Sequence, residues 1–371
     1  MRQNGSLGLR LPVSGRWAVI LVLCVGAFLL GGCGPVPPGA SGSGGQIIFS
    51  GYGGEYEEMM RKYVIAPFEK KFNAKVVFDA QGSSNQKLAK IRASKDQYTF
   101  DSCILTAGDV LAAGKEGLLE QIDESKIPEM KNLYEQARTG GRGFGPVVAF
   151  DGLVLVYNKK KVAPAPDSWT VMWDEKYKGK VAISHAQEDK GMFLLLLEAY
   201  RHGGNEKNVG PGFESIRKLV PNVGAWLTLS PQYVPYLERE EVWLAPYWNG
   251  RAQLYKDEGL PIDVAFPKEG TMAVSNIWVV PKAAKNKDLA YKFINFYLEV
   301  EQQKAWAENI YYSPTNKNVK LAPETASRVI YGPDQISKMR LPDAEVIAME
   351  RPKWVEQWNK EIQEALKYQQ Q

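Results

Sequence analysis

The sequence is poor in the residue types that form disulfides and bind transition metals. It has only three cysteines and two histidines among 371 residues. Cys24 and Cys33 lie within or directly after an N-terminal apolar run, which leaves Cys103 for the rest of the chain. A single thiol cannot form a disulfide there, so the core must supply the stability. His185 and His202 show no zinc-site spacing with cysteine, and we expect neither a metal nor another cofactor.

Motifs of common enzyme classes are also missing. No serine lies in a G-x-S-x-G motif of the hydrolase type. The glycine-rich stretch GGRGFG at 140–145 lacks the G-x-G-x-x-G spacing of dinucleotide sites. We therefore expect a protein that is not an enzyme. Catalysis by carboxylates alone is the alternative that these absences leave open.

The chain has no marked excess of positive charge. Its 46 Lys and Arg and 42 Asp and Glu give a net charge of +4, and Arg2, Arg10 and Arg16 account for three of the basic residues. Without these three, 43 basic residues face 42 acidic ones, so we expect no nucleic-acid partner. The 44% hydrophobic and 24% charged content is typical of a globular protein. Residues 47–371 are long enough for two domains.

The N-terminal apolar run, WAVILVLCVGAFLLGG, is shorter than the ~20 residues of a membrane-spanning helix. It follows a basic stretch, which is typical of a secretory signal peptide. Its end, Leu30-Gly31-Gly32-Cys33, resembles the bacterial lipobox, in which the signal is cut before an acylated cysteine. We expect a lipoprotein signal peptide at 1–32, lipidation of Cys33 and a flexible linker at 33–46. The rest would lie in the periplasm or on the outer face of the cell membrane; an uncleaved anchor is the alternative.

Strand and helix patterns alternate after the linker, with Ser83-Ser84 as one helix cap. Strands are predicted at 45–54, 74–81 and 100–106, and helices at 55–64, 85–94 and 108–117. This alternation predicts an α/β fold with parallel strands. Ligands of such sheets bind at the carboxyl ends of the strands, where Gly51–Gly54, Gly82–Ser84 and Thr106–Gly108 lie here.

Two long apolar segments, 147–162 and 263–281, are suited to strands that cross between two lobes. Backbone changes near 152–154 and 272–274 would then let the lobes close on a solute that binds the closed state better. Tyr52 and Trp248 lie at predicted strand ends beside glycines, where a core aromatic is less expected. Aromatic walls attract organic cations by ~0.5–2 kcal/mol per contact.

Four segments resemble the spermidine/putrescine-type solute-binding proteins of ABC importers: DSWTVMWDEKYKGKVAIS, PYWNGRAQLYKDEGLPIDVAFPKEG, NIWVVPKAAKNKDLAYKFINFYLE and IYYSPTNK. The resemblance implies the two-lobed type II periplasmic-binding-protein fold, with mixed central sheets flanked by helices and a ligand cleft between the lobes. It places lobe 1 at 47–152 plus 273–318, and lobe 2 at 153–272 plus 319–371. It also implies a monomeric receptor that delivers a polyamine or related small organic amine to an ABC permease in the cytoplasmic membrane.

The same resemblance suggests the ligand-binding residues, which are Tyr52, Gly53, Ser84, Thr106, Glu188, Trp248, Asn276 and Tyr312. The chain departs from the family pattern at three positions of the expected cleft. The main amine-binding aspartate falls on Asn276, a second carboxylate falls on Gly191, and an aromatic falls on Val274. An asparagine offers both a donor and an acceptor, which suits a neutral, zwitterionic or carboxylated ligand better than an ammonium.

Three alternatives therefore stay open. The solute could be amino-acid-like, opine-like or a phosphonate, with the glycine turn at Gly53-Gly54 presenting backbone N–H groups to an anion. It could be a ferric ion bound by Tyr311 and Tyr312. In a different functional class, the chain could be a structural or signalling exoprotein that binds another protein.

Overall fold

The computed structural model describes residues 44–80, 82–94 and 97–369. The expected signal peptide, Cys33 and most of the expected linker lie outside the described residues. One sheet runs through residues 46–340 in the strand order β2-β1-β3-β9-β4-β7-β5-β6, while β8 and β10 pair with β4 and β11 pairs with β9. The strands are β1 (Gln46–Gly51), β2 (Lys75–Ala80), β3 (Ser102–Thr106), β4 (Val147–Asn158), β5 (Val181–Ser184), β6 (Val223–Leu227), β7 (Leu244–Trp248), β8 (Ile262–Ala265), β9 (Thr271–Val279), β10 (Ser313–Pro314) and β11 (Met339–Arg340).

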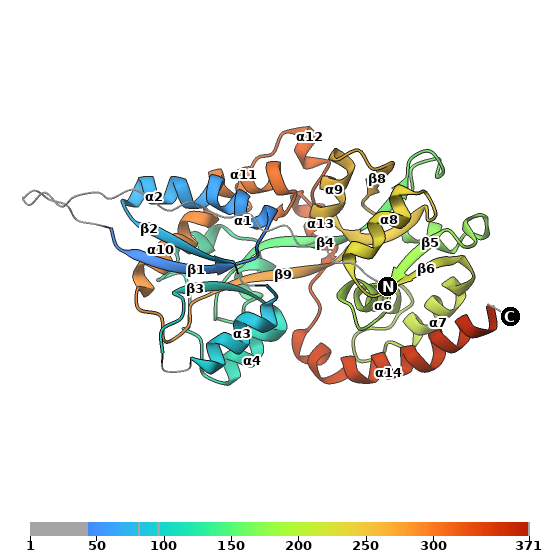
Figure 1. The fold of residues 1–371 in the computed structure, drawn as a ribbon, viewed down its shortest axis with the longest axis horizontal. Helices are drawn as coiled ribbons and strands as arrows, with labels where there is room; N and C mark the ends of the chain where they lie inside the picture. The colour runs from blue at the N-terminus through green and yellow to red at the C-terminus, as the bar shows by residue number, and fades with distance from the viewer. Residues whose placement is uncertain (1–43, 81, 95–96, 370–371) are drawn as a thin grey trace, which may run out of the picture. The chain divides into compact units, whose positions relative to one another are not determined.

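Helices connect these strands and pack on the sheet. In the first half of the sheet, Figure 1 shows α1, α2 and α11 on one face and α3 and α4 on the other. The helices are α1 (Glu55–Met60), α2 (Ala66–Phe72), α3 (Ser84–Ala93), α4 (Ala107–Lys115), α5 (Glu135–Thr139), α6 (Asp189–Arg201), α7 (Gly210–Leu219), α8 (Tyr233–Glu238), α9 (Asn249–Asp257), α10 (Lys287–Leu298), α11 (Val300–Ile310), α12 (Pro323–Ala326), α13 (Gly332–Lys338) and α14 (Ala344–Gln369).

The α/β fold predicted from the alternating pattern is confirmed. β1 pairs in parallel with β2 and with β3, and helices connect these strands along the chain. The predicted cap of α3 is present: the Ser83 hydroxyl accepts the N–H of Gln86, and the Gln86 side chain accepts the N–H of Ser83. This reciprocal pair satisfies two backbone donors that a helix start otherwise leaves open.

β4 and β9 form the antiparallel pair that joins the two halves of the sheet. Between Ala149 and Gly152, β4 pairs with β9, and between Leu153 and Tyr157 it pairs with β7. All of β4 is buried, which explains why its sequence is an almost continuous apolar run. The segment 147–162 therefore contains a strand shared by both halves, as its sequence predicts.

Separate apolar cores lie on the two halves. In the first core the Phe49 and Trp278 rings lie 4.5 Å apart, between centroids, and Phe293 packs against both. Trp169 and Trp358 are fully buried in the second. A tryptophan or phenylalanine buries a large apolar area, so these side chains contribute strongly to the stability of each half.

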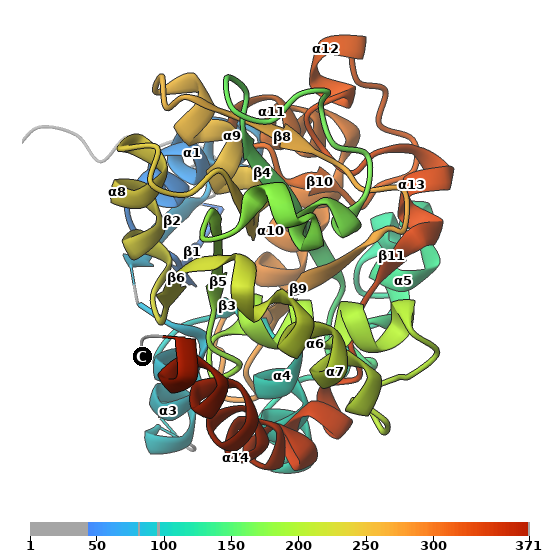
Figure 2. The same cartoon turned by 90° about the vertical axis from the view of Figure 1, so that its right-hand side faces the viewer.

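The last segment of the chain contacts both halves. Ile330, Ile336 and Met339 belong to the first core, whereas Trp354 and Trp358 belong to the second. Helix α14 contacts α4 of the first half and α7 of the second, and Figure 2 shows it running below these helices. The lobe boundaries drawn from the sequence stay a prediction.

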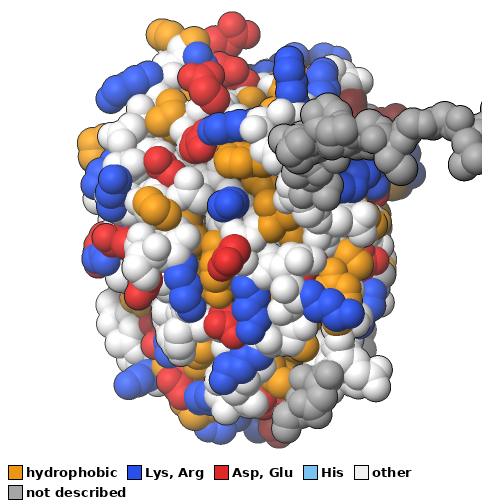
Figure 3. Space-filling model, turned by 90° about the vertical axis from the view of Figure 1, so that its left-hand side faces the viewer, with side chains coloured by type: hydrophobic (Ala, Val, Ile, Leu, Met, Phe, Trp, Pro, Cys, Tyr) orange, Lys and Arg blue, Asp and Glu red, His pale blue; other side chains and the backbone are white. Residues whose placement is uncertain are grey.

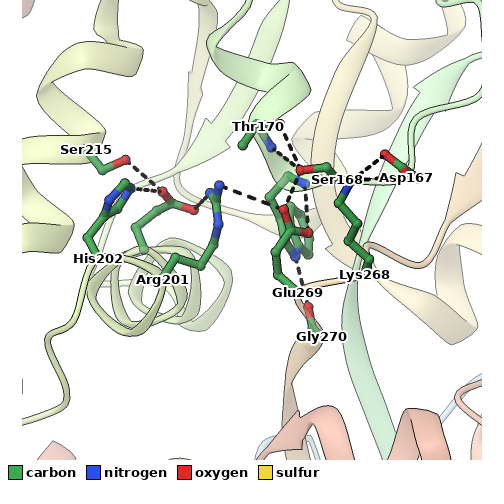
Figure 4. A network of polar contacts seen from close by, with 11 residues as sticks. Asp167, Ser168, Thr170, Arg201, His202, Ser215, Lys268, Glu269 and Gly270 are labelled. Atoms are coloured by element: carbon green, nitrogen blue, oxygen red, sulfur yellow. Dashed lines mark hydrogen bonds and ion pairs between the residues drawn. The ribbon is translucent and has the colours of Figure 1, made fainter.

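A buried network of charges holds the second half together (Figure 4). Glu198 of α6 is fully buried, and its carboxylate lies 2.5 Å from Arg201 and accepts the hydroxyl of Ser215 in α7 at 2.7 Å. Arg201 in turn lies 3.9 Å from Glu269, which precedes β9 and accepts the hydroxyl of Ser168. The network thus connects two helices with the segments before Trp169 and before β9.

Candidate functional site

Two cavities lie at the crossing strands, and each is lined by residues from both halves of the sheet. The first, here called the aromatic cavity, has a volume of about 470 Å³. Its lining comprises Glu55, Tyr56, Asp151, Pro231, Tyr247, Trp248, Gly250, Arg251, Leu254, Tyr255, Ile310 and Tyr312. The second, here called the α14 cavity, measures about 620 Å³ and is lined by Asn85, residues 106–109, Gln187, Asp189, Met192, Phe193, residues 273–275 and residues from Pro342 to Val355.

Strand register places several predicted site residues on one face of the sheet. Thr106 lies opposite Asn276, and Trp248 lies opposite Leu153. Asp151 lies opposite Val274, two positions along β9 from Asn276. Side chains opposite each other in an antiparallel pair share a face, and so do alternate residues of one strand. Thr106, Asn276, Asp151 and Trp248 therefore project from the same face.

Asp151 is the carboxylate that the sequence analysis missed. It is 9% exposed, and its Oδ1 accepts the N–H of Gly250 at 3.0 Å. Burial raises the pKa of Asp151 to about 7, although this hydrogen bond and the positive charge of Arg251 act to lower it. Trp248 and Tyr312 line the same cavity. The sequence offers one signal for this residue, because Asp151 is the only acidic residue inside the apolar run 147–162.

In the first half, two contacts join predicted site residues in pairs, Ser84 with Thr106 and Tyr52 with Asn276. The Ser84 hydroxyl accepts the N–H of Thr106 at 2.9 Å, and the Tyr52 hydroxyl lies 3.5 Å from the Asn276 carbonyl oxygen. Gly53 lies in the turn between β1 and α1. Among the described residues, Tyr52, Gly53, Ser84, Asn276 and Glu188 line neither cavity, and their role in binding stays a prediction.

Glu188 already contacts a cation of the protein. It caps α6, accepting the N–H of Lys190 at 2.8 Å, and its other carboxylate oxygen lies 2.5 Å from the Lys190 ammonium. Lys190 is fully buried, and its ammonium lies 5.4 Å from the ring centre of Tyr247 and 5.9 Å from that of Trp248. Burial lowers the pKa of Lys190, although Glu188 acts in the opposite direction. The carboxylate of Glu188 is thus largely neutralised before any solute arrives.

Gly191, which replaces a family carboxylate, has a packing reason for being glycine. A Cβ atom there would lie 2.3 Å from the carbonyl oxygens of both Ser184 and His185. No side chain fits without moving the start of α6 away from the end of β5. The missing carboxylate at this position therefore follows from a close contact between backbones.

This contact gives a stability prediction. We expect Gly191→Ala to lower the free energy of unfolding by about 1–3 kcal/mol, because the new Cβ collides with rigid backbone. Gly210→Ala is the matched control, since its Cβ would meet its nearest neighbour at 3.6 Å, and its effect should stay within about 0.5 kcal/mol. Urea unfolding measures both values. Equal effects of the two substitutions would contradict the explanation.

Tyr311 and Tyr312 contact different groups. The Tyr311 hydroxyl donates to Asp257 at 2.6 Å and accepts from Arg328 at 2.8 Å, whereas Tyr312 lines the aromatic cavity. Burial raises the pKa of both phenols, to about 12 for Tyr311, which disfavours the phenolate form that a ferric ion needs. Among the described residues, no group of three or more His, Cys, Asp or Glu side chains could hold a metal ion.

Comparison with known proteins gives the family. A sequence profile described as bacterial extracellular solute-binding protein matches residues 63–332. The chain is 30% identical over 293 residues to the spermidine/putrescine-binding periplasmic protein of Escherichia coli, covering 76% of this chain and 80% of that protein. It is 25% identical over 305 residues to the gamma-aminobutyric acid-binding protein of Pseudomonas aeruginosa, covering 79% and 84% of the two chains.

Solved structures have the same fold. The crystal structure of an ABC transporter from Clostridium perfringens is similar with a TM-score of 0.74 and 26% identity, covering 85% of this chain and 99% of that one. The spermidine/putrescine substrate-binding protein PotD of Streptococcus pneumoniae gives a TM-score of 0.69 at 22% identity, covering 84% and 99%. From the profile match, the sequence identity and the two-lobed fold, we conclude that this chain belongs to the family of bacterial extracellular solute-binding proteins.

Proposed function

We propose that the protein is the solute receptor of an ABC importer and that it captures a polyamine or a related small organic amine. The names of its relatives support this class of solute, since several bind spermidine, putrescine or gamma-aminobutyric acid, all of which carry an amine. Capture proceeds by closure of the two lobes around the crossing strands, and the closed receptor delivers the solute to a membrane permease.

The observation that carries this proposal is the buried carboxylate of Asp151 in the aromatic cavity. The aromatic side chains of Trp248 and Tyr312 line the same cavity as Asp151. A buried carboxylate with a raised pKa gains most from an incoming ammonium, which restores its charge and replaces lost hydration. The aromatic faces add cation–π attraction to the same group.

The location of the receptor is part of the proposal. We infer that the chain is exported, cut before Cys33 and tethered to the outer face of the cell membrane or in the periplasm through a lipid on that residue. Within the residues that the structure describes, no helix has both the length and the apolar character to cross a membrane. We further propose that it acts as a monomer and performs no catalysis. The lobes would then be 47–152 with 273–318, and 153–272 with 319–371.

A zwitterionic solute is the second candidate. The Lys190 ammonium next to Glu188 favours it, because a protein cation behind Trp248 opposes a second ammonium of the solute. A ferric ion is disfavoured by the separate contacts of Tyr311 and Tyr312 described above.

Thermal unfolding of the purified full-length protein tests the amine proposal. The panel comprises butan-1-amine, butane-1,4-diamine, spermidine, 4-aminobutanoate, a phosphonate and ferric citrate. We expect amines to raise the melting temperature, since a ligand at a hundred times its Kd adds about 2.7 kcal/mol to the stability of the folded state. A response to ferric citrate or to the phosphonate, with none to any amine, would contradict the proposal.

A further inference from the structure

The α14 cavity is the larger of the two cavities at the crossing strands, and the proposed function gives it no role. Its volume of about 620 Å³ is in the range of ~300–1,000 Å³ that small-molecule sites have. Residues 106–109 of the first half, Met192 and Phe193 of the second half, β9 and α14 form its walls. Because α14 contacts both α4 and α7, one wall of the cavity extends from one half of the sheet to the other (Figure 2).

Apolar side chains make up most of this lining. Met192 and Phe193 of α6 are only 2% and 6% exposed, and Ile347 of α14 packs against the edge of the second core. The lining residues of α14 are spaced three and four residues apart, which places them on one face of the helix. This set, here called the α14 stripe, comprises Ala344, Ile347, Ala348, Arg351 and Val355. An apolar group placed against it leaves water, which is favourable.

The charged residues of the lining already interact with other groups of the protein. Asp189 lies 2.9 Å from Arg351, which also donates to the carbonyl oxygen of Gln187 at 2.6 Å. Asp109 accepts the hydroxyl of Thr106 at 3.2 Å and lies in the first turn of α4, where a helix stabilises a carboxylate. The cavity is therefore better suited to an apolar group than to a further charge.

The α14 cavity and the aromatic cavity share a wall. Asp151, which lines the aromatic cavity, lies opposite Val274, which lines the α14 cavity. The Cβ atoms of such opposite residues lie about 4.5–5.5 Å apart on one face of the sheet. The rings of Trp248 and Phe193, one from each cavity, pack edge to face with their centres 5.6 Å apart. A short carbon chain on an amine at Asp151 therefore reaches the α14 cavity by passing Val274.

We propose that the solute is an amphipathic amine, whose ammonium binds at Asp151 and whose apolar alkyl group occupies the α14 cavity. The inference rests on the proposed amine receptor and names the class of amine that it binds. The α14 stripe, Met192 and Phe193 contact the alkyl group and remove it from water. A polyamine would instead bring a second ammonium into this apolar lining, and the burial of an unpaired charge opposes binding.

A series of linear amines tests this inference on the full-length protein. Isothermal titration calorimetry at pH 7.5 compares butan-1-amine, hexan-1-amine, octan-1-amine, octane-1,8-diamine and octan-1-ol. We expect the affinity of the monoamines to rise about threefold for each added CH₂, so that octan-1-amine binds at least about thirtyfold more tightly than butan-1-amine. The diamine and the alcohol should each bind at least about tenfold more weakly than octan-1-amine, because one buries a second charge and the other lacks the ammonium.

The outcomes separate this inference from the proposed function. If the affinity stayed flat or fell along the monoamines, or if the diamine bound as tightly as octan-1-amine, the apolar group would be overturned and the amine receptor would stand. If octan-1-ol bound as tightly as octan-1-amine, the ammonium would contribute nothing and the amine receptor itself would be overturned. Failure of all five compounds to bind would overturn both.

Two variants of α14 assign the effect to the cavity. Ala348→Phe narrows the cavity from the α14 stripe, and the ratio of the affinities for octan-1-amine and butan-1-amine should fall by about tenfold. Met349→Phe is the matched control, because Met349 is 60% exposed and lies outside the stripe, and its ratio should stay within about twofold of the unmodified protein. If Ala348→Phe does not fold, Ala344→Leu from the same stripe replaces it. An unchanged ratio in the folded stripe variant would refute the role of the α14 cavity.

Discussion

Replacing Asp151 by asparagine is expected to weaken the binding of amine solutes by about a hundredfold, or roughly 2–4 kcal/mol. The substitution keeps the size of the side chain and the oxygen that accepts the N–H of Gly250. It removes the charge that an ammonium would meet in the cavity that Trp248 and Tyr312 also line. Isothermal titration calorimetry at pH 7.5 with the amine that gives the largest thermal shift measures the change.

The same substitution is expected to stabilise the solute-free protein. The pKa of Asp151 is about 7 in the folded state against 3.8 in its ordinary state, so the unfolded chain ionises first as the pH rises. The free energy of unfolding therefore falls between about pH 4 and pH 7, and it stays lower above pH 7. Asp151→Asn should abolish this pH dependence and raise the free energy of unfolding at pH 8 by about 1–3 kcal/mol.

Amine binding should depend on pH in a matching way. Only ionised Asp151 pairs with the ammonium, so affinity should rise between about pH 5.5 and pH 8 in the unmodified protein and stay flat in Asp151→Asn. Asp334→Asn is the control, because Asp334 is 79% exposed and forms an ion pair on α13. If Asp151→Asn retained amine affinity within about twofold, the ammonium would have to bind elsewhere.

The second large effect concerns the network of Figure 4. Glu198→Ala is expected to lower the free energy of unfolding by about 3–5 kcal/mol, because it leaves the largely buried Arg201 without its closest carboxylate. It also removes the acceptor of the Ser215 hydroxyl, which joins α6 to α7. Urea unfolding monitored by circular dichroism measures the loss.

An exposed pair with the same spacing provides the control. Glu350 and Lys353 also lie three residues apart on a helix, but their side chains are 32% and 70% exposed. Glu350→Ala should therefore cost no more than about 0.5 kcal/mol. If both glutamates gave the same small change, the buried network would not stabilise the second half.

The surface charges on the face in Figure 3 do not indicate a second binding site. Lys and Arg side chains are interspersed there with Asp and Glu side chains. This agrees with the near balance of basic and acidic residues in the sequence. Long-range attraction of a polyanion needs an extended patch of one sign, and this face does not present one.

The sequence determined the fold of this protein to a large extent. Local patterns suffice for such features, because apolar alternation, helix caps and turn glycines act between residues close in the chain. The strands β1 to β3, the capped helix α3 and the long strand β4 all follow from them. The resemblance in four segments likewise identified the family that the comparisons confirm.

The electrostatics of the site were decided only by the tertiary structure. Asp151 reads as one acid in an apolar run, and its raised pKa arises because strands distant in sequence bury it. Lys87 lies in helix α3, and the pattern of that helix does not predict that its side chain is fully buried against the Tyr52 ring. Glu188 reads as a ligand carboxylate, but the fold sets Lys190 against it. Burial and charge pairing depend on which segments meet in space, and a linear sequence carries that information only through the completed fold.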